Sequence, residues 1–221
     1  MNEQEVIKKT ADYVKKSLLG ESSGHDWWHV YRVWSLAKEI GKKEKGNMFV
    51  IELAALLHDI ADWKFNNGSE EVGATLAEKW LRGLHVDEEV VNHVKEIILN
   101  ISFKGANAEN KIKTIEGKCV QDADRLDGIG AIGIGRTFAY GGHMRREMHN
   151  PEIKPVMANN FEEYKKNGLT TINHFYEKLL LIKDRMNTKT GEKIAKEKHK
   201  FMKQFLKQFY KEWEGNFNIK K

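Results

Sequence analysis

Apolar residues recur at spacings of three and four along nearly the whole chain, which is the repeat of one buried face of an α-helix. Between residues 87 and 101 this stripe consists of Val90, Val94, Ile97 and Ile101. No convincing segment alternates apolar and polar residues, as a half-exposed strand would. The chain also has only two prolines, so long stretches are free of the residue that most disrupts helices. The sequence therefore predicts an all-α fold.

The limits of the expected helices follow from capping residues, glycines and changes of periodicity. Asp26 and Asp87 are good N-caps because a carboxylate accepts hydrogen bonds from the unpaired N–H groups of a first helical turn. The most apolar stretch, residues 48–60, is too long for a strand and is expected to be a buried helix. The other expected helices are one ending near Gly20, one carrying Val30 to Ile40, those near 70–81, 87–101, 109–127, 160–166 and 171–187, and a last one with a stripe of Phe201, Phe205, Phe209 and Trp213.

The segment from Tyr140 to Asn159 contains Gly141, Gly142 and both prolines. It is expected to be a long ordered loop or a lid rather than a linker between domains. A chain of 221 residues fits one domain with an appendage. We therefore expect a single helical domain over residues 1–221, with a core at about 22–140 and a C-terminal helical part at about 141–221.

Charge is distributed unevenly along the chain. The whole sequence has 37 Lys and Arg against 32 Asp and Glu, a net charge of +5. Residues 183–221 alone contain twelve basic and five acidic residues, a net of +7, so the first 182 residues carry −2. The basic charge is thus a property of the last helix, where it is expected to form a solvated face, with a homodimer contact as the alternative. Nucleic acid is not an expected partner.

The composition restricts the cellular setting and the kinds of site. Cys119 is the only cysteine, which excludes an intramolecular disulfide and a multi-cysteine metal site. The N-terminus has no apolar run resembling a signal peptide, and no stretch approaches the roughly 20 apolar residues of a membrane span. We expect a cytoplasmic protein that does not enter a membrane.

Four polar residues in apolar surroundings suggest a metal site. His58 and Asp59 end the buried helix 48–60, and an unpaired charge there would be costly. His29 lies in the first turns of its helix, and Asp124 lies in an acid-rich part of the helix 109–127. Two imidazoles and two carboxylates suit one divalent ion such as Mn²⁺, Mg²⁺, Co²⁺, Ni²⁺ or Fe²⁺ better than a closed structural zinc site.

The order His29, His58-Asp59, Asp124 resembles the HD superfamily of metal-dependent phosphohydrolases. The local sequences HDWWHVYRV, ALLHDIADWKF and VQDADRLDGIGAIG are similar to small bacterial HD proteins related to nucleotide pyrophosphohydrolases. The resemblance covers roughly residues 22–140. It implies a compact multi-helix HD bundle with a C-terminal helical extension, and an enzyme that binds one divalent ion.

The resemblance also implies a small phosphorylated substrate, expected to be a nucleotide. That the anhydride of a nucleoside triphosphate is the target rests on the resemblance alone. A nucleotide monophosphatase or a cyclic-nucleotide phosphodiesterase would use the same site. A different class is a regulatory module that senses a nucleotide without turning it over.

Acid–base roles are assigned to residues close to the expected ligands. Asp62 follows His58 by four residues, on the same side of a continued helix, and is expected to orient or deprotonate the attacking water, with a capping role as the alternative. His25 is a candidate acid toward the leaving oxygen. Asp127, one turn beyond Asp124, is expected to support a ligand imidazole or an arginine.

Three basic residues are candidate phosphate contacts. Arg32 follows His29 by three residues and either meets a phosphate or pairs with Asp59. Lys64 and Arg125 are the others. A glycine pattern at 128–133 matches the dinucleotide-binding motif formally, but no strand precedes it, so nicotinamide binding is not expected.

Overall fold

The structure is a computed structural model, and it describes residues 1–18, 26–60, 71–101, 110–157 and 170–216. Within these ranges every extended regular element is a helix, and the one β-type contact is an isolated bridge between Glu147 and Thr170. The prediction of an all-α fold is confirmed. The predicted helix at 160–166 lies outside the described residues.

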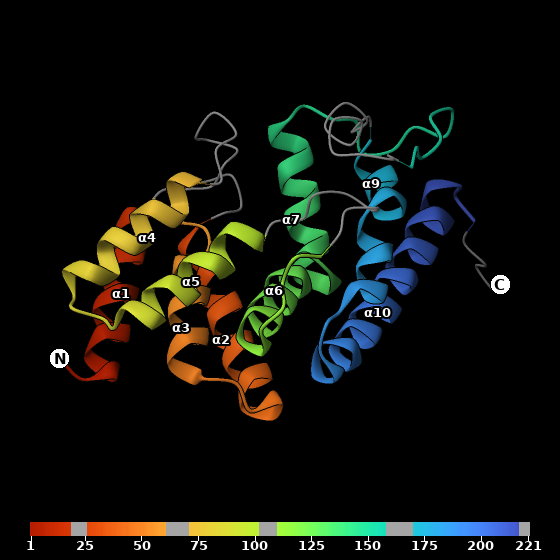
Figure 1. Ribbon diagram of the computed structural model, residues 1–221. Helices are drawn as coiled ribbons and strands as arrows, with labels where there is room; N and C mark the ends of the chain where they lie inside the picture. Colours follow the sequence, from red (N-terminus) through yellow and green to blue (C-terminus); the bar gives the residue numbers. More distant parts are fainter. Residues whose placement is uncertain (19–25, 61–70, 102–109, 158–169, 217–221) are drawn as a thin grey trace.

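The described helices form two groups on either side of α6 and α7 (Figure 1). The N-terminal group is α1 to α5, and the C-terminal group is α9, η1 and α10. Their bounds are α1 Glu3–Ser17, α2 Trp27–Glu44, α3 Met48–Leu57, α4 Glu71–Gly83, α5 Glu88–Asn100, α6 Ile115–Asp127, α7 Gly130–His143, α9 Thr171–Glu177, the 3-10 helix η1 Leu179–Arg185, and α10 Lys189–Trp213.

Capping side chains fix where several helices begin. Asp26 accepts a hydrogen bond from the backbone N–H of His29 at 2.9 Å, and Asp87 accepts one from Glu89 at 2.9 Å, so both predicted N-caps are confirmed. Thr114 caps α6 at Ile115, so this helix begins later than the predicted residue 109. The prediction failed there because a threonine is a weaker start signal than an aspartate.

The predicted helix 171–187 is two elements rather than one. The α-helix ends at Glu177, and Lys178 has φ −141° and ψ −58°, outside helical geometry. The chain then continues as η1, which has the tighter 3-10 winding. The break places the Lys178 side chain between two helical segments.

Helix α3 lies at the centre of the core. It packs against α1, α2, α5 and α6, and its residues from Leu53 to Leu57 are fully buried. Because neighbouring helices cover α3 on most sides, all of its residues except Glu52 are apolar, and they do not form a single stripe. Truncating Leu56 to alanine in such a core would cost about 2–5 kcal/mol of stability. The packing fixes the C-terminal end of α3, which carries His58 and Asp59.

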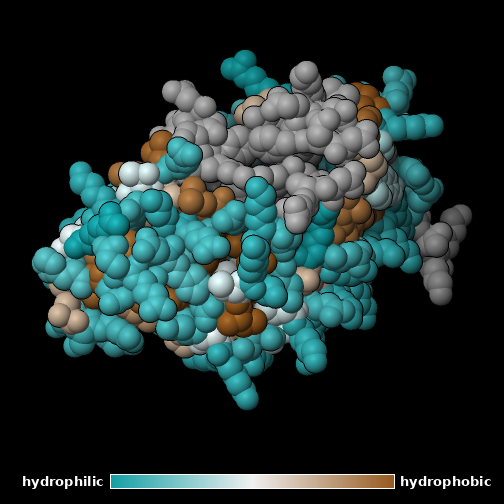
Figure 2. Space-filling view, in the orientation of Figure 1, coloured by the Kyte–Doolittle hydropathy of each residue, from teal (hydrophilic) through white to brown (hydrophobic). Residues whose placement is uncertain are grey.

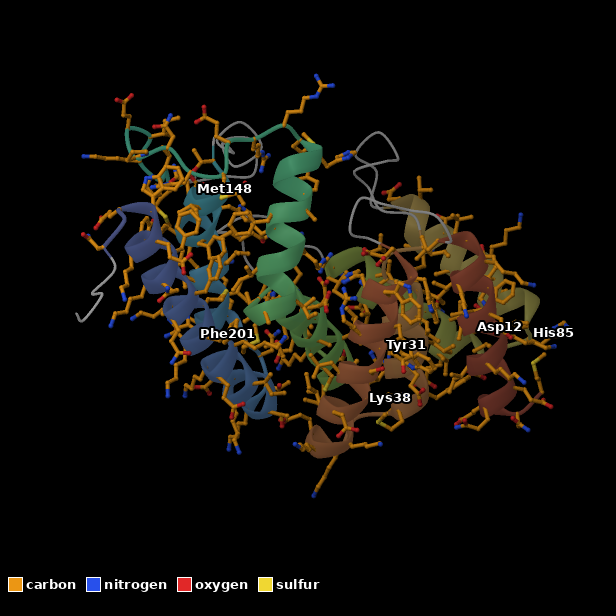
Figure 3. All side chains as sticks on the ribbon, turned by 180° about the vertical axis from the view of Figure 1, so that it is seen from behind. Asp12, Tyr31, Lys38, His85, Met148 and Phe201 are labelled. Carbon is orange, nitrogen blue, oxygen red and sulfur yellow. The ribbon has the colours of Figure 1, made fainter. Side chains whose placement is uncertain are left out.

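The buried face of α10 differs from the predicted stripe. Ala195, Met202 and Leu206 are buried, whereas Phe201 and Trp213 are about half exposed, at 47% and 49%. Figure 3 shows Phe201 on α10, on the opposite side of the molecule from α1. The predicted stripe was wrong at both its ends, because four-residue spacing over a long helix drifts away from the 3.6-residue repeat.

The face seen in Figure 2 is mostly hydrophilic, with separate small apolar patches. Among the described helices, none combines the length and apolarity that crossing a membrane requires. The glycine pattern at 128–133 falls at the junction of α6 and α7, where Gly130 has φ +77°. A residue with a side chain would be strained there, so this glycine serves the turn between two helices.

Candidate metal centre

Three helices bring four donor side chains to one point. His29 comes from the first turn of α2, His58 and Asp59 follow the last residue of α3, and Asp124 lies on α6. The Nε2 atom of His29 lies 3.3 Å from Nε2 of His58, 3.2 Å from Asp59 Oδ2 and 3.5 Å from Asp124 Oδ1. His58 Nε2 lies 3.5 Å from Asp59 Oδ2 and 3.9 Å from Asp124 Oδ1. The sequence placed these residues in separate segments, and the fold joins them.

The other nitrogen of each imidazole has its own acceptor. His29 Nδ1 lies 2.7 Å from Asp127 Oδ2, and His58 Nδ1 lies 2.8 Å from the carbonyl oxygen of Ala55. These contacts assign the N–H of each neutral ring to Nδ1, which leaves a lone pair on each Nε2. In these tautomers two nitrogen lone pairs and two carboxylates face one another, which requires a positive charge between them, either a metal ion or a proton on one of the imidazoles.

The spacing of the donors fits a divalent ion. Bonds of about 2.1 Å in an octahedral complex place neighbouring donors about 3 Å apart, and the distances to His29 Nε2 are 3.2–3.5 Å. His29, His58 and Asp59 form a His-His-Asp cluster that could hold an ion, with donor atoms all within 4.8 Å of one another. Asp124 approaches both imidazoles of that cluster.

The centre is buried on one side and accessible on the other. The side chains of His29 and His58 are 0% and 2% exposed, Asp59 is 17% exposed and Asp124 is 33% exposed. A bound ion would therefore be reached from the side of Asp124.

Asp127 organises the polar groups behind His29. Its carboxylate accepts from Arg32 Nε at 2.7 Å, Arg32 Nη2 at 3.0 Å and Arg136 Nη1 at 2.7 Å, in addition to the His29 contact. Burial raises the pKa of Asp127, but the hydrogen bonds from His29 and Arg32 and the charge of Arg136 outweigh burial and hold it far below its usual range. Asp127 stays ionised and fixes the orientation of the His29 ring.

The contact with Asp127 raises the pKa of His29, whereas it lowers the pKa of Asp127. Burial lowers the pKa of the imidazole, but hydrogen bonds to Asp127 and Asp59 outweigh that effect and raise it to about 9. Without a metal ion the ring therefore holds a second proton, on Nε2. A divalent ion would take the place of that proton, so metal binding and protonation compete at this nitrogen.

The other residues singled out in the sequence fall into three groups. Asp127 contacts both an imidazole and an arginine, which were its two predicted roles. Arg32 makes its hydrogen bonds to Asp127, and Arg125 Nη1 donates to the carbonyl of Arg185. The remaining predicted residues, which lie outside the described residues, are His25, Asp62 and Lys64.

One basic residue beside the centre was not found from the sequence. Arg136 is nine residues beyond Asp127, on α7, and donates to the Asp127 carboxylate. It has no local sequence signal, since its relation to the centre depends on how α7 packs. Cys119 is fully buried, and burial together with nearby carboxylates raises its pKa to about 12, so its thiol is not an available nucleophile.

Comparisons with known proteins show the family. The HD domain family model matches residues 27–129, a range that contains all four donors. A crystal structure of an HD-superfamily hydrolase from Bacillus thuringiensis is 47% identical, covers 96% of this chain and 99% of its own, and has a TM-score of 0.76. The uncharacterized protein YpgQ of Bacillus subtilis is 39% identical over 208 residues, 92% of each chain. A crystal structure of YpgQ in complex with ADP, aligned at 34% identity over 93% of this chain and 97% of that one, has a TM-score of 0.73.

The chain belongs to the HD superfamily, as the resemblance in the sequence predicted. Its fold and its relatives make it a metal-dependent phosphohydrolase. HD domains bind divalent metals, and the cluster of His29, His58 and Asp59 is the group that could hold one here.

Proposed function

We propose that this enzyme hydrolyses a phosphoanhydride bond of a nucleoside triphosphate and releases pyrophosphate. The proposed metal ligands are His29, His58, Asp59 and Asp124. The observation that carries the proposal is the convergence of two carboxylates with the Nε2 atoms of two imidazoles, each of which has its Nδ1 against another acceptor. The nucleotide is supported by the ADP complex of YpgQ, because ADP contains a phosphoanhydride and that protein aligns over 93% of this chain.

A bound divalent ion would polarise a phosphoryl oxygen and lower the pKa of water in the site. The protein's own contribution is mainly orientation, because phosphoryl transfer needs little covalent chemistry from side chains. Asp127 fixes the His29 ring, and the carbonyl of Ala55 fixes the His58 ring. In the reaction, water would attack the α-phosphorus and the bond to the bridging oxygen would break. The leaving group is pyrophosphate.

Proton transfer is assigned to residues identified in the sequence. We propose that Asp62 accepts a proton from the attacking water and that His25 donates one to the leaving oxygen. Each lies only a few residues along the chain from a proposed ligand, Asp62 from Asp59 and His25 from His29, and this closeness supports placing both near the metal. Replacing Asp62 with asparagine should abolish turnover while metal binding survives. An unchanged rate would remove Asp62 from the mechanism.

The test of the proposed function is a product assay. Metal-stripped protein is given Mn²⁺, Mg²⁺, Co²⁺ or Ni²⁺ and a panel of nucleoside mono-, di-, tri- and cyclic phosphates. Pyrophosphate from triphosphates is the expected result. Orthophosphate from monophosphates would instead show a monophosphatase, and opening of a cyclic nucleotide would show a phosphodiesterase. Tight nucleotide binding without any product would show a sensor.

A further inference from the structure

Helix α10 lies outside the range that the HD family model matches, yet it packs against helices of the metal centre. The match ends at residue 129, and α10 begins at Lys189. The helix packs against α2, α6 and α7, on the side of α6 away from α3 (Figure 1). Helix α2 carries His29, and α6 carries Asp124 and Asp127. A side chain of α10 is therefore in a position to act on the centre from outside the matched range.

The Lys198 side chain of α10 reaches the junction between α6 and α7. Its Nζ atom donates to the carbonyl oxygen of Leu126 at 2.8 Å and to that of Ile129 at 3.3 Å. The last carbonyl groups of a helix have no partner within the helix, and they make its C-terminal end partly negative, so an ammonium group is stabilising there. Asp127, the last residue of α6, lies between Leu126 and Ile129 in the chain. The lysine thus holds the backbone on both sides of this aspartate.

The backbone of the junction is shaped to accept the lysine. Gly130 has φ +77°, and a β-carbon at this position would lie 3.0 Å from Cγ of Lys198 and 3.2 Å from its Cβ. Ordinary van der Waals contacts are longer, so any side chain at residue 130 would push the lysine stem away. The aliphatic stem therefore packs on the glycine while the charged end reaches the two carbonyls. The hydrogen bonds and the glycine fix the same position for this side chain.

The charge of Lys198 is also felt by the groups behind the His29 ring. Burial lowers the pKa of Lys198, the negative charge of Asp127 opposes that shift, and the positive charge of Arg32 reinforces it. The Asp127 carboxylate itself accepts hydrogen bonds from side chains of α2 and α7. Asp127 is therefore held at its carboxylate by α2 and α7, and at its backbone by α10.

We propose that Lys198 is a positioning residue of the metal centre, because it fixes the end of α6 on which Asp127 holds the His29 ring. This role rests on the proposed function only in requiring the metal ion, whatever the nucleotide. A purely electrostatic role would have the opposite sign, since removing a positive charge near a cation site strengthens cation binding. Weaker metal binding after loss of the lysine would therefore report positioning.

The experiment compares the Mn²⁺ affinity of wild type, Lys198→Met and Lys200→Met by calorimetry. Methionine keeps an unbranched stem against Gly130 but has no ammonium group, and the control removes an exposed lysine of the same helix. Lys198→Met should bind Mn²⁺ about 3–10-fold more weakly, a smaller loss than the one expected for a group that contacts a ligand directly. Lys200→Met should match wild type. If Lys198→Met does not unfold cooperatively, Lys198→Gln, which also removes the charge, takes its place.

A double-mutant cycle with Asp127→Asn separates positioning from a general effect on the fold. If Lys198 acts through Asp127, Lys198→Met should lower Mn²⁺ affinity by less than about twofold when Asp127 is already asparagine. Full additivity of the two losses would overturn the proposal, because Lys198 would then act independently of Asp127. An Mn²⁺ affinity of Lys198→Met equal to or higher than that of wild type would overturn it as well.

The proposed function can fail separately from the role of Lys198. A wild-type protein that binds Mn²⁺ but hydrolyses no nucleotide in the product assay would refute the proposed function alone, and the Mn²⁺ affinities would still decide the role of the lysine. A wild-type protein that binds no Mn²⁺ would overturn the metal centre and the role of Lys198 together.

Discussion

Two buried aspartates of α6, Asp122 in its middle and Asp127 at its C-terminal end, have opposite electrostatics. In the described part of the chain the donors to Asp122 are neutral, namely the backbone N–H and side chain of Asn187 and the backbone N–H and hydroxyl of Thr188. Asp127 accepts from two guanidinium groups and an imidazole. Burial raises the pKa of Asp122 despite its hydrogen bonds, whereas the pKa of Asp127 is lowered despite its burial.

The different partners of Asp122 and Asp127 give the two residues different roles. Asp122 ties the segment before α10 to α6, and Gly191 leaves room for it, because a β-carbon there would collide with the Asp122 carboxylate. Asp127 holds the His29 ring. Asp124 lies between them, less buried and facing the imidazoles. For these three aspartates, the hydrogen-bond partners of the carboxylate distinguish a role at the proposed metal centre from a structural role better than burial does.

The largest expected effect comes from Asp124. Replacing it with alanine should lower activity by about a thousandfold or more, the equivalent of the several kcal/mol that a bound ion supplies to the transition state. Stability should change little, because the side chain is one-third exposed. The measurement is kcat/KM of the variant and of wild type treated with a chelator. The two proteins should show the same residual rate. Near-normal activity in the variant would contradict the proposed ligand set.

Asp127→Asn should act on both metal binding and stability. Asparagine keeps one acceptor oxygen but no charge, so it holds the His29 ring less firmly and metal affinity should fall about 10–100-fold. Two arginines would also lose a charged partner, which should cost about 3 kcal/mol. Metal titration and urea unfolding of the metal-free protein measure the two effects separately. An unchanged metal affinity would mean that Asp127 has only a structural role.

Asp122→Asn should affect stability alone. The amide can accept at one oxygen only, and its NH2 group would face the donors of Asn187 or Thr188, so a loss of about 1–3 kcal/mol is expected. Metal affinity should stay within twofold of wild type. If it fell as in Asp127→Asn, the two aspartates of α6 would not be functionally distinct.

The smallest effect is on the pH dependence of unfolding. The folded pKa of Asp127 is below its unfolded value of about 4, so the stability it contributes is present above that pH and is lost on acidification. Asp122 has a raised folded pKa, so its contribution weakens as the pH rises from about 4. Urea unfolding of metal-free protein at several pH values below 7 should show a shallower acid loss in Asp127→Asn and a steeper one in Asp122→Asn. Identical profiles would contradict the opposite pKa shifts.

The sequence was sufficient to predict the fold class and most helices, because apolar spacing and capping aspartates are local signals. It failed where local signals were weak, as at Thr114 and at the break after Glu177. The four proposed ligands were selected because a buried His58-Asp59 pair needs partners. Arg136 could not be selected, since only the packing of α7 relates it to Asp127 on α6.

The most direct test of the metal centre is diffraction from crystals grown with Mn²⁺, recorded at a wavelength where manganese scatters anomalously. One strong peak is predicted within bonding distance of His29 Nε2, His58 Nε2 and the carboxylates of Asp59 and Asp124, and it should be absent from Asp124→Ala crystals. A peak elsewhere, or an imidazole pair with no peak beside it at saturating Mn²⁺, would contradict the ligand set.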